Sequence, residues 1–150
     1  MEKYLITNKT IALIKDFNKT IIYNVDNKEV FNTNIKKIIE YNCNYYGSSL
    51  LGRKKSASKI LNIKYKLPII IDDVNNLILI QLNSPREDYC IFLITNKIID
   101  YKKEEDKLKI ICINNNIFYS KISPNILEKS LINSIRLNNV LNSRKYVNFV

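Results

Sequence analysis

The 150-residue chain carries a formal net charge of +10, contains no histidine and is 46% apolar. A chain of this length fits one domain with a sizeable core, and its apolar content excludes a disordered protein. The lack of histidine excludes Ser-His-Asp and Cys-His catalysis as well as the common zinc sites. No apolar run approaches the ~18 residues that a membrane-spanning helix needs. We therefore expect a single soluble domain, residues 1–150, that is not an enzyme, binds no metal or cofactor and has no contact with a membrane.

The cysteines indicate a reducing compartment. Cys43, Cys90 and Cys112 are odd in number and far apart in the sequence, which does not suit a disulfide framework. The opening Met-Glu-Lys-Tyr lacks the charged and then apolar pattern of a signal peptide. These features predict reduced, largely buried cysteines in a cytoplasmic protein.

The first 32 residues are expected to form short strands. β-Branched and aromatic residues dominate three runs, residues 5–6, 10–14 and 20–25. Turn-forming residues at 8–9, 16–18 and 26–28 separate these runs. The pattern predicts an antiparallel meander.

The hydrophobic period then becomes that of a helix. Isoleucines at positions 35, 38 and 39 follow the N-cap candidates Thr33 and Asn34, and Gly47 suits the residue just beyond the helix. A second helix is expected from a cap at Ser48 or Ser49 to about Leu61. Its predicted core-facing residues are Leu50, Ala57 and Leu61, and its predicted outer face holds Ser48, Gly52, Lys55, Ser56 and Lys59.

The rest of the chain is expected to be mainly strands, at residues 69–71, 77–82, 89–95, 98–102, 108–113 and 117–121. Residues 103–107 and 114–116 fit hairpin loops. Ser123 and Pro124 predict the start of a helix to about residue 141, with Leu127, Leu131 and Ile135 along one face. No regular structure is expected for residues 144–150. The prediction is an α+β fold: an antiparallel sheet with a central helix-turn-helix-like helical pair and a C-terminal helix.

Positive charge is concentrated around the second predicted helix. Between Glu40 and Asp72 there is no acidic residue, whereas six Lys or Arg residues lie there. Segregated positive charge is typical of proteins that bind a polyanion, because each neutralised phosphate releases counterions. The alternative is a solvated basic face that serves solubility.

Residues 47–56, Gly-Ser-Ser-Leu-Leu-Gly-Arg-Lys-Lys-Ser, hold both glycines of the chain. Their spacing matches a nucleotide-binding P-loop, but Arg53 and Lys54 stand where that motif requires Lys and then Ser or Thr. A helix pattern also precedes the segment, whereas a P-loop follows a strand. A metal-dependent nuclease could use Asp72 or Asp73 with Glu105 and Lys107, but these residues fit a turn and a hairpin tip instead.

The same stretch suits nucleic acid. Hydroxyls, Lys or Arg, and free backbone N–H groups at a helix N-terminus are the groups that contact phosphates. The candidate DNA-binding residues are Ser48, Ser49, Gly52, Arg53, Lys54, Lys55 and Lys59. Gly52 would let a sugar-phosphate strand come close. In the competing interpretation the glycines only let two helices cross, and the basic side chains are solvated.

Three segments resemble the ComK-type competence transcription factors. The first is Cys43-Asn-Tyr-Tyr-Gly-Ser-Ser-Leu-Leu-Gly-Arg-Lys54, with the family's cysteine, aromatic pair, Gly-Ser-Ser and Gly-Arg-Lys in the same register. Lys66-Leu-Pro-Ile-Ile-Ile-Asp72 and Ser84-Pro-Arg86, followed by Cys90, continue the resemblance in the same order. The chain departs from the family pattern in having Phe92, and no tryptophan, where a tryptophan is usual.

The resemblance implies a transcriptional activator of competence (DNA uptake) genes that binds AT-rich double-stranded DNA through the minor groove. It also implies a homo-oligomer, with RNA polymerase and a protease adaptor as further partners. Arg53 is the first choice for insertion into the groove. Lys54, Lys55 and Lys59 are assigned to phosphates and Ser48 and Ser49 to anchoring at the helix start, with Tyr45 and Tyr46 packed beneath. The alternative is a non-DNA interaction protein whose basic face binds an acidic protein partner.

Overall fold

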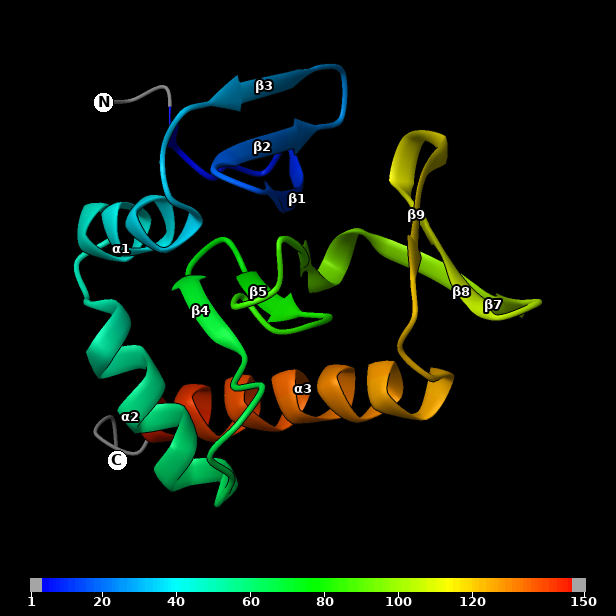
Figure 1. Ribbon diagram of the computed structural model, residues 1–150. Coiled ribbons are helices and arrows are strands. Elements are labelled where there is room, and N and C mark those ends of the chain that lie inside the picture. Colours follow the sequence, from blue (N-terminus) through cyan, green and yellow to red (C-terminus); the bar gives the residue numbers. More distant parts are fainter. Residues whose placement is uncertain (1–3, 147–150) are drawn as a thin grey trace.

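A six-stranded antiparallel sheet forms the centre of the molecule (Figure 1). The computed structural model describes residues 4–146. The strand order is β3-β2-β1-β6-β5-β4. The strands are β1 (Thr10–Asp16), β2 (Lys19–Asn24), β3 (Lys28–Phe31), β4 (Ile69–Asp72), β5 (Leu77–Gln81) and β6 (Tyr89–Ile94). The predicted N-terminal meander is therefore confirmed as β1–β3, although its third strand was not identified from the sequence.

Residues 5–6 were predicted to be a strand, and this is wrong. The backbone of Ile6 is hydrogen-bonded to a side chain of the first helix and to one just after it, instead of to a neighbouring strand. Ile6 N donates to Asn42 Oδ1 at 2.7 Å, and Tyr46 Oη donates to Ile6 O at 2.7 Å. Because both backbone groups of Ile6 are satisfied in this way, the segment needs no neighbouring strand.

Two helices, α1 (Ile35–Tyr45) and α2 (Leu50–Leu61), connect β3 to β4. Asn34 caps α1 by accepting a hydrogen bond from Lys36 N, as the sequence indicated. The buried residues of α2 are Leu50, Ala57 and Leu61, so its predicted core-facing side is confirmed.

The remaining strands form a separate antiparallel sheet of three, in the order β7-β8-β9. These are β7 (Ile98–Glu104), β8 (Lys107–Cys112) and β9 (Asn116–Ser120), with short 3₁₀ turns η2 (Thr95–Lys97) and η3 (Ile113–Asn115) before β7 and β9. The helix α3 (Pro124–Tyr146) then runs beneath β4 and β5 in Figure 1. It is longer than predicted and includes Arg144 and Lys145; residues 147–150 lie outside the described part.

The predicted stripe on α3 is only partly correct. Leu127 is buried, but Ile135 is 61% exposed. The buried line runs instead through Leu127, Ser130, Ser134 and Leu137. Ser134 can lie in this line because its hydroxyl donates to Ser130 O at 2.8 Å.

Three apolar clusters hold the elements together. On one face of the main sheet α1 packs against residues that include Leu13, Ile22 and Ile71. On the other face β8, β9 and α3 pack against Ile14, Ile80 and Leu93. A third cluster joins α2 and α3 to β4 and β5. The α+β class is thus confirmed, with the strands divided between two sheets. No helix within residues 4–146 is long and apolar enough to cross a bilayer.

Candidate nucleic-acid interface

The junction between α1 and α2 is built by three successive residues, Gly47, Ser48 and Ser49. Gly47 N donates to Asn44 O at 3.1 Å, and Ser48 N donates to Cys43 O at 2.8 Å. This pair of bonds is a Schellman motif, which requires a left-handed residue just beyond the helix. Gly47 supplies it with φ = 89°, so the predicted role of this glycine is confirmed.

Ser49 begins the next helix directly. Its backbone is extended, and its hydroxyl accepts a hydrogen bond from Gly52 N at 3.0 Å. A β-carbon on residue 52 would lie 2.9 Å from that hydroxyl oxygen. The presence of glycine at both positions is therefore accounted for by the geometry of the helix junction.

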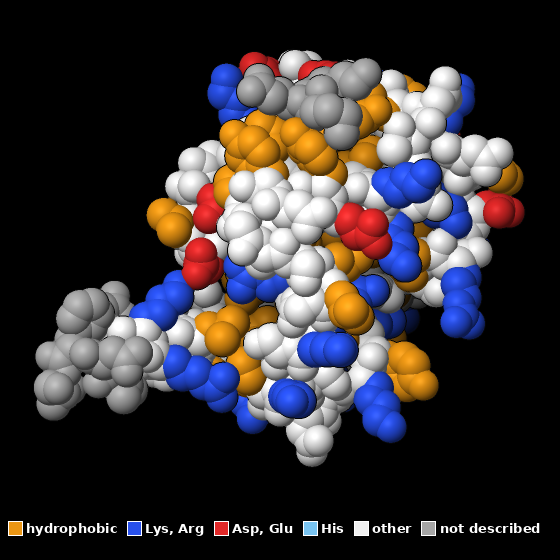
Figure 2. Space-filling view, turned by 90° about the vertical axis from the view of Figure 1, so that its left-hand side faces the viewer, with side chains coloured by type: hydrophobic (Ala, Val, Ile, Leu, Met, Phe, Trp, Pro, Cys, Tyr) orange, Lys and Arg blue, Asp and Glu red, His pale blue; other side chains and the backbone are white. Residues whose placement is uncertain are grey.

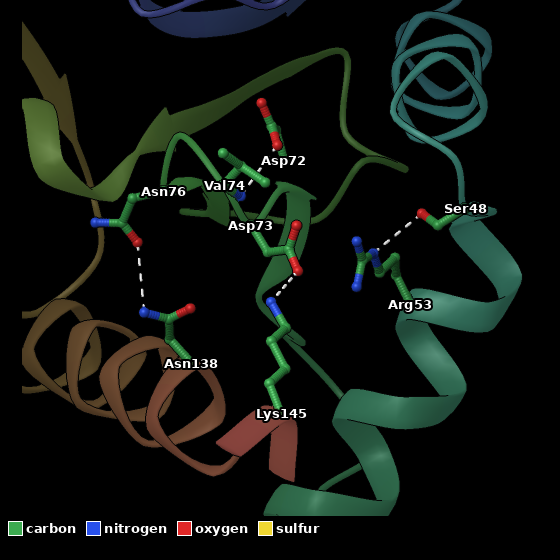
Figure 3. Close-up of polar contacts among 8 residues, drawn as sticks. All are labelled: Ser48, Arg53, Asp72, Asp73, Val74, Asn76, Asn138 and Lys145. Atoms are coloured by element: carbon green, nitrogen blue, oxygen red, sulfur yellow. Dashed lines mark hydrogen bonds and ion pairs between the residues drawn. The ribbon is translucent and has the colours of Figure 1, made fainter. Parts of the chain in front are cut away.

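Arg53 is held against this junction. Its Nε donates to Ser48 Oγ at 3.0 Å, and Ser48 Oγ donates to Cys43 O at 3.4 Å. In Figure 3 the guanidinium points from α2 toward the turn that carries Asp73. Arg53 is half-buried, and within the described part of the chain its two terminal amino groups form no hydrogen bond.

The three lysines of the candidate site point in different directions. Lys55 and Lys59 are exposed on the outer side of α2, together with Gly52. Lys54 follows Leu50 by four residues and precedes Ala57 by three, so it lies above the core-facing line and reaches the mouth of a cavity. The seven candidate residues thus form a capping network, an outer pair of lysines and one lysine directed to the cavity.

That cavity has a volume of about 720 Å³ and lies between the starts of α1 and α2, the β1–β2 turn and the β5–β6 turn. Isoleucine, leucine and phenylalanine side chains, including Phe92, form its apolar lining. Its charged lining residues are Lys15, Lys19, Lys36, Lys54, Arg86 and a single carboxylate, Asp88. Four of these five cations were missed in the sequence, because they come from three separate segments. Only Ser84-Pro85-Arg86 gave a signal, as part of the family resemblance.

Positive charge is visible on the face that carries the two helices. Figure 2 shows Lys and Arg side chains gathered over its lower and right-hand parts, with scattered Asp and Glu between them. Such a surface is suited to a polyanion, since exposed cations release counterions from phosphates when they bind.

The two tyrosines before the junction, Tyr45 and Tyr46, have different environments. Tyr46 packs against the core and donates to Ile6 O, as expected for a residue beneath the junction. Tyr45 is 54% exposed, so it was wrongly predicted to be packed beneath it.

The carboxylates near α2 have structural partners. Asp72 is 6% exposed, and its two oxygens accept from Val74 N at 3.1 Å and Asn75 Nδ2 at 2.6 Å. Asp73 forms an ion pair with Lys145 (Figure 3). The hydrogen bond from Lys145 lowers the pKa of the Asp73 carboxyl below its usual value. Among the described residues, no group of three or more Cys, Asp or Glu gathers in a way that could hold a metal ion.

The cysteines are buried and free. Burial raises the pKa of Cys43 and of Cys90 to about 11 and that of Cys112 to about 12. At neutral pH these thiols are protonated and weakly reactive. They serve as small apolar core residues.

The comparisons with known proteins agree on one family. A family model described as "ComK protein" matches residues 1–146. A protein described as "Competence transcription factor" from Bacillus subtilis (strain 168) is 26% identical over 136 residues, which are 87% of this chain and 71% of that protein. No solved structure gives a significant match. The chain belongs to the ComK family.

Proposed function

We propose that this protein is a sequence-specific DNA-binding activator of competence genes, acting in the cytoplasm on AT-rich sites through minor-groove and phosphate contacts. The observation that carries the proposal is the cluster of basic residues on α2, one of which, Lys54, lines a cavity together with four further cations. Membership of the ComK family supports the regulatory role, and the positive charge supports nucleic acid as the class of ligand.

The phosphate contacts are assigned to side chains that are already exposed. Lys55 and Lys59 stand on the outer side of α2, and Lys54 stands at the cavity mouth. The positive end of the α2 dipole adds to their field at the first turn. Ser48 and Ser49 lie at this turn, and Gly52 leaves space for a sugar-phosphate strand.

Arg53 is assigned to the minor groove. A-tracts have a narrow groove with an enhanced negative potential that favours arginine. In the free protein its Nε is bonded to Ser48. Insertion therefore either uses the terminal amino groups alone or breaks this bond, which costs about 0.5–1.5 kcal/mol.

The experiment is an electrophoretic mobility-shift titration on an AT-rich duplex. The triple variant Arg53→Ala, Lys54→Ala, Lys55→Ala is expected to lose most of its affinity. The control Lys103→Ala, Lys107→Ala, Lys121→Ala removes the same charge from three exposed lysines of the β7–β9 region and should bind nearly as well as the wild type. Equal affinity of the wild type and the α2 triple variant would show that α2 is not the DNA-binding surface.

The alternative, a basic face that binds an acidic protein partner, would be favoured by the absence of duplex binding at low salt. Homo-oligomerisation on DNA, and contacts with RNA polymerase and a protease adaptor, are further parts of the proposal that rest on the family resemblance. Sedimentation velocity with and without duplex measures the first of these directly.

A further inference from the structure

We infer that Arg86, at the tip of the β5–β6 turn, is a second arginine that enters the minor groove, and that the cavity between it and α2 holds one sugar-phosphate strand. This inference rests on the proposed function and extends its surface to a second element. Arg86 shares the cavity with Lys54 but is not one of the seven candidate residues at α2.

Arg86 stands at the third position of a tight turn. Glu87 N donates to Ser84 O at 3.1 Å, which closes the turn, and Pro85 occupies its second position. Arg86 N donates to Ser84 Oγ at 3.1 Å. Serine at the first position and proline at the second are the residues that favour such a turn. The side chain of Arg86 is therefore displayed at the tip of a preformed structure.

The turn is fixed to the sheet at both ends. Asn83 Oδ1 accepts from Ile91 N at 3.1 Å, and Asn83 Nδ2 donates to Tyr89 O at 2.6 Å. Lys15 Nζ donates to Pro85 O at 2.7 Å. Phe17 N donates to Asp88 O at 2.6 Å. A turn held by so many bonds loses little conformational freedom when it binds a ligand.

The guanidinium of Arg86 is available. Arg86 is exposed, and within residues 4–146 its side chain has no hydrogen-bond or ion-pair partner despite the two acids that follow it. Glu87 is directed elsewhere, since its Oε2 accepts from Asn83 Nδ2 at 2.6 Å and it lines a different cavity. The Nε of Arg53 is bonded to Ser48, whereas all of the guanidinium nitrogens of Arg86 can enter a groove without breaking a bond.

The cavity explains how DNA would lie beside this arginine. Lys36 and Lys54 stand on its helical side, and Lys15, Lys19 and Arg86 stand on the side of the two turns. One carboxylate, that of Asp88, faces these five cations. Phosphates would pair with the four lysines, and the apolar lining suits the carbon face of deoxyribose. A strand in this position brings the adjoining groove to the tip of the turn.

The test is fluorescence anisotropy on three duplexes of equal length: an AT-rich duplex, its G·C counterpart, and one in which inosine replaces guanine. Inosine lacks the minor-groove amino group of guanine, so an I·C pair resembles A·T in the minor groove and G·C in the major groove. The wild type should bind the AT-rich and inosine duplexes alike and the G·C duplex more weakly. Arg86→Ala should weaken the first two by about 5- to 150-fold and the G·C duplex much less. Arg86→Lys should keep the charge and lose most of the discrimination.

The controls separate this inference from the proposed function. Lys103→Ala, which removes an exposed charge from β7, should change none of the three affinities appreciably, and thermal unfolding should show that Arg86→Ala is folded. An equal loss on all three duplexes would make Arg86 a phosphate contact and overturn the inference. Unchanged binding by Arg86→Ala, with lost binding by the α2 triple variant, would overturn the inference and leave the proposed function standing. Failure of the wild type to bind any duplex at low salt would overturn both.

Discussion

The hydroxyl of Ser49 accepts a hydrogen bond from Gly52 N at 3.0 Å and lies 2.9 Å from where a β-carbon of residue 52 would stand. The cap and the glycine therefore depend on each other. A β-carbon at position 52 would require the Ser49 hydroxyl to shift from this position. The stability of α2 is thus expected to depend on residues 49 and 52 together.

The first prediction is a double-mutant cycle on this pair. Ser49→Ala should lower the free energy of unfolding by about 1 kcal/mol, because the cap is lost. Gly52→Ala should bring little or no gain in the wild type, since the lost cap offsets the higher helix propensity of alanine. In the Ser49→Ala background the same change should stabilise by about 0.5–1 kcal/mol. Urea unfolding of the wild type, the two single variants and the double variant measures the coupling free energy. Additive effects would mean that residues 49 and 52 do not influence each other's contribution to stability.

The second prediction separates capping from charge at Ser49. Asparagine and aspartate are both good N-caps. The free energies of unfolding of Ser49→Asn and Ser49→Asp should therefore lie within about 0.5 kcal/mol of the wild-type value. The aspartate adds a negative charge beside the proposed phosphate path, and should weaken duplex binding several-fold relative to the asparagine. Binding titrations of the two variants check this. Equal affinities would place the DNA away from the start of α2.

The third prediction concerns Lys59, which is exposed in the last turn of α2. If Lys59 contacts a phosphate, Lys59→Ala should weaken AT-rich and G·C-rich duplexes similarly and reduce the salt slope by about one unit. The matched variant Lys121→Ala, on the three-stranded sheet side, should keep the wild-type slope. Measurement of affinity at several salt concentrations gives both slopes. A loss confined to AT-rich DNA would instead make Lys59 a groove contact.

The fourth prediction concerns Asn42, which is fully buried in α1. Its Oδ1 is the acceptor for Ile6 N, and its Nδ2 donates to Ile38 O at 2.8 Å. Asn42→Leu should lower the free energy of unfolding by about 1–3 kcal/mol, because the buried N–H of Ile6 loses its acceptor. The exposed Asn44 on the same helix provides the control, and Asn44→Leu should change stability by less than about 0.5 kcal/mol.

The fifth prediction is a pH dependence from the Asp73–Lys145 ion pair. The pKa of Asp73 is lowered in the folded protein, so the pair contributes stability above the unfolded pKa of 3.8, and this stability is lost as the pH falls through the folded pKa. Asp73→Asn should remove that part of the acid dependence and, because the pair is partly exposed, cost less than about 1 kcal/mol at neutral pH. Urea unfolding from about pH 6 to pH 2 tests it. Asp106→Asn, at an exposed hairpin tip, should keep the wild-type profile.

The helix junction could be predicted because its signals are local. The caps Asn34 and Ser49 and the left-handed Gly47 each act within a few residues. Gly47 was identified directly, and each cap was one of two candidates, the other being Thr33 or Ser48. The second sheet could not be predicted, since strand composition does not say which strands pair. Ile135 was misplaced because its spacing fits a helical face equally well whether that face is buried or exposed.

The candidate site was predicted only as far as α2 extends. The sequence identified the basic residues of the helix, but not that Arg53 is bonded to Ser48 while Lys54 points to a cavity. Lys15, Lys36 and Arg86 meet there only because β1 pairs with β6 and α1 packs on the sheet. Such convergence depends on tertiary structure and leaves no mark in the local sequence.

The pairing of β1 with β6 joins residues 12–16 to residues 89–93, and all of α1 and α2 lies in the loop that this pairing closes. Closing so long a loop is slow compared with forming a helix or a hairpin. The two turns that line the cavity lie at the ends of these strands, and α1 packs on the sheet that the strands join. During synthesis the proposed DNA-binding surface would thus be completed only after β6 has been made, so a shortened nascent chain that ends before β6 should not bind the AT-rich duplex.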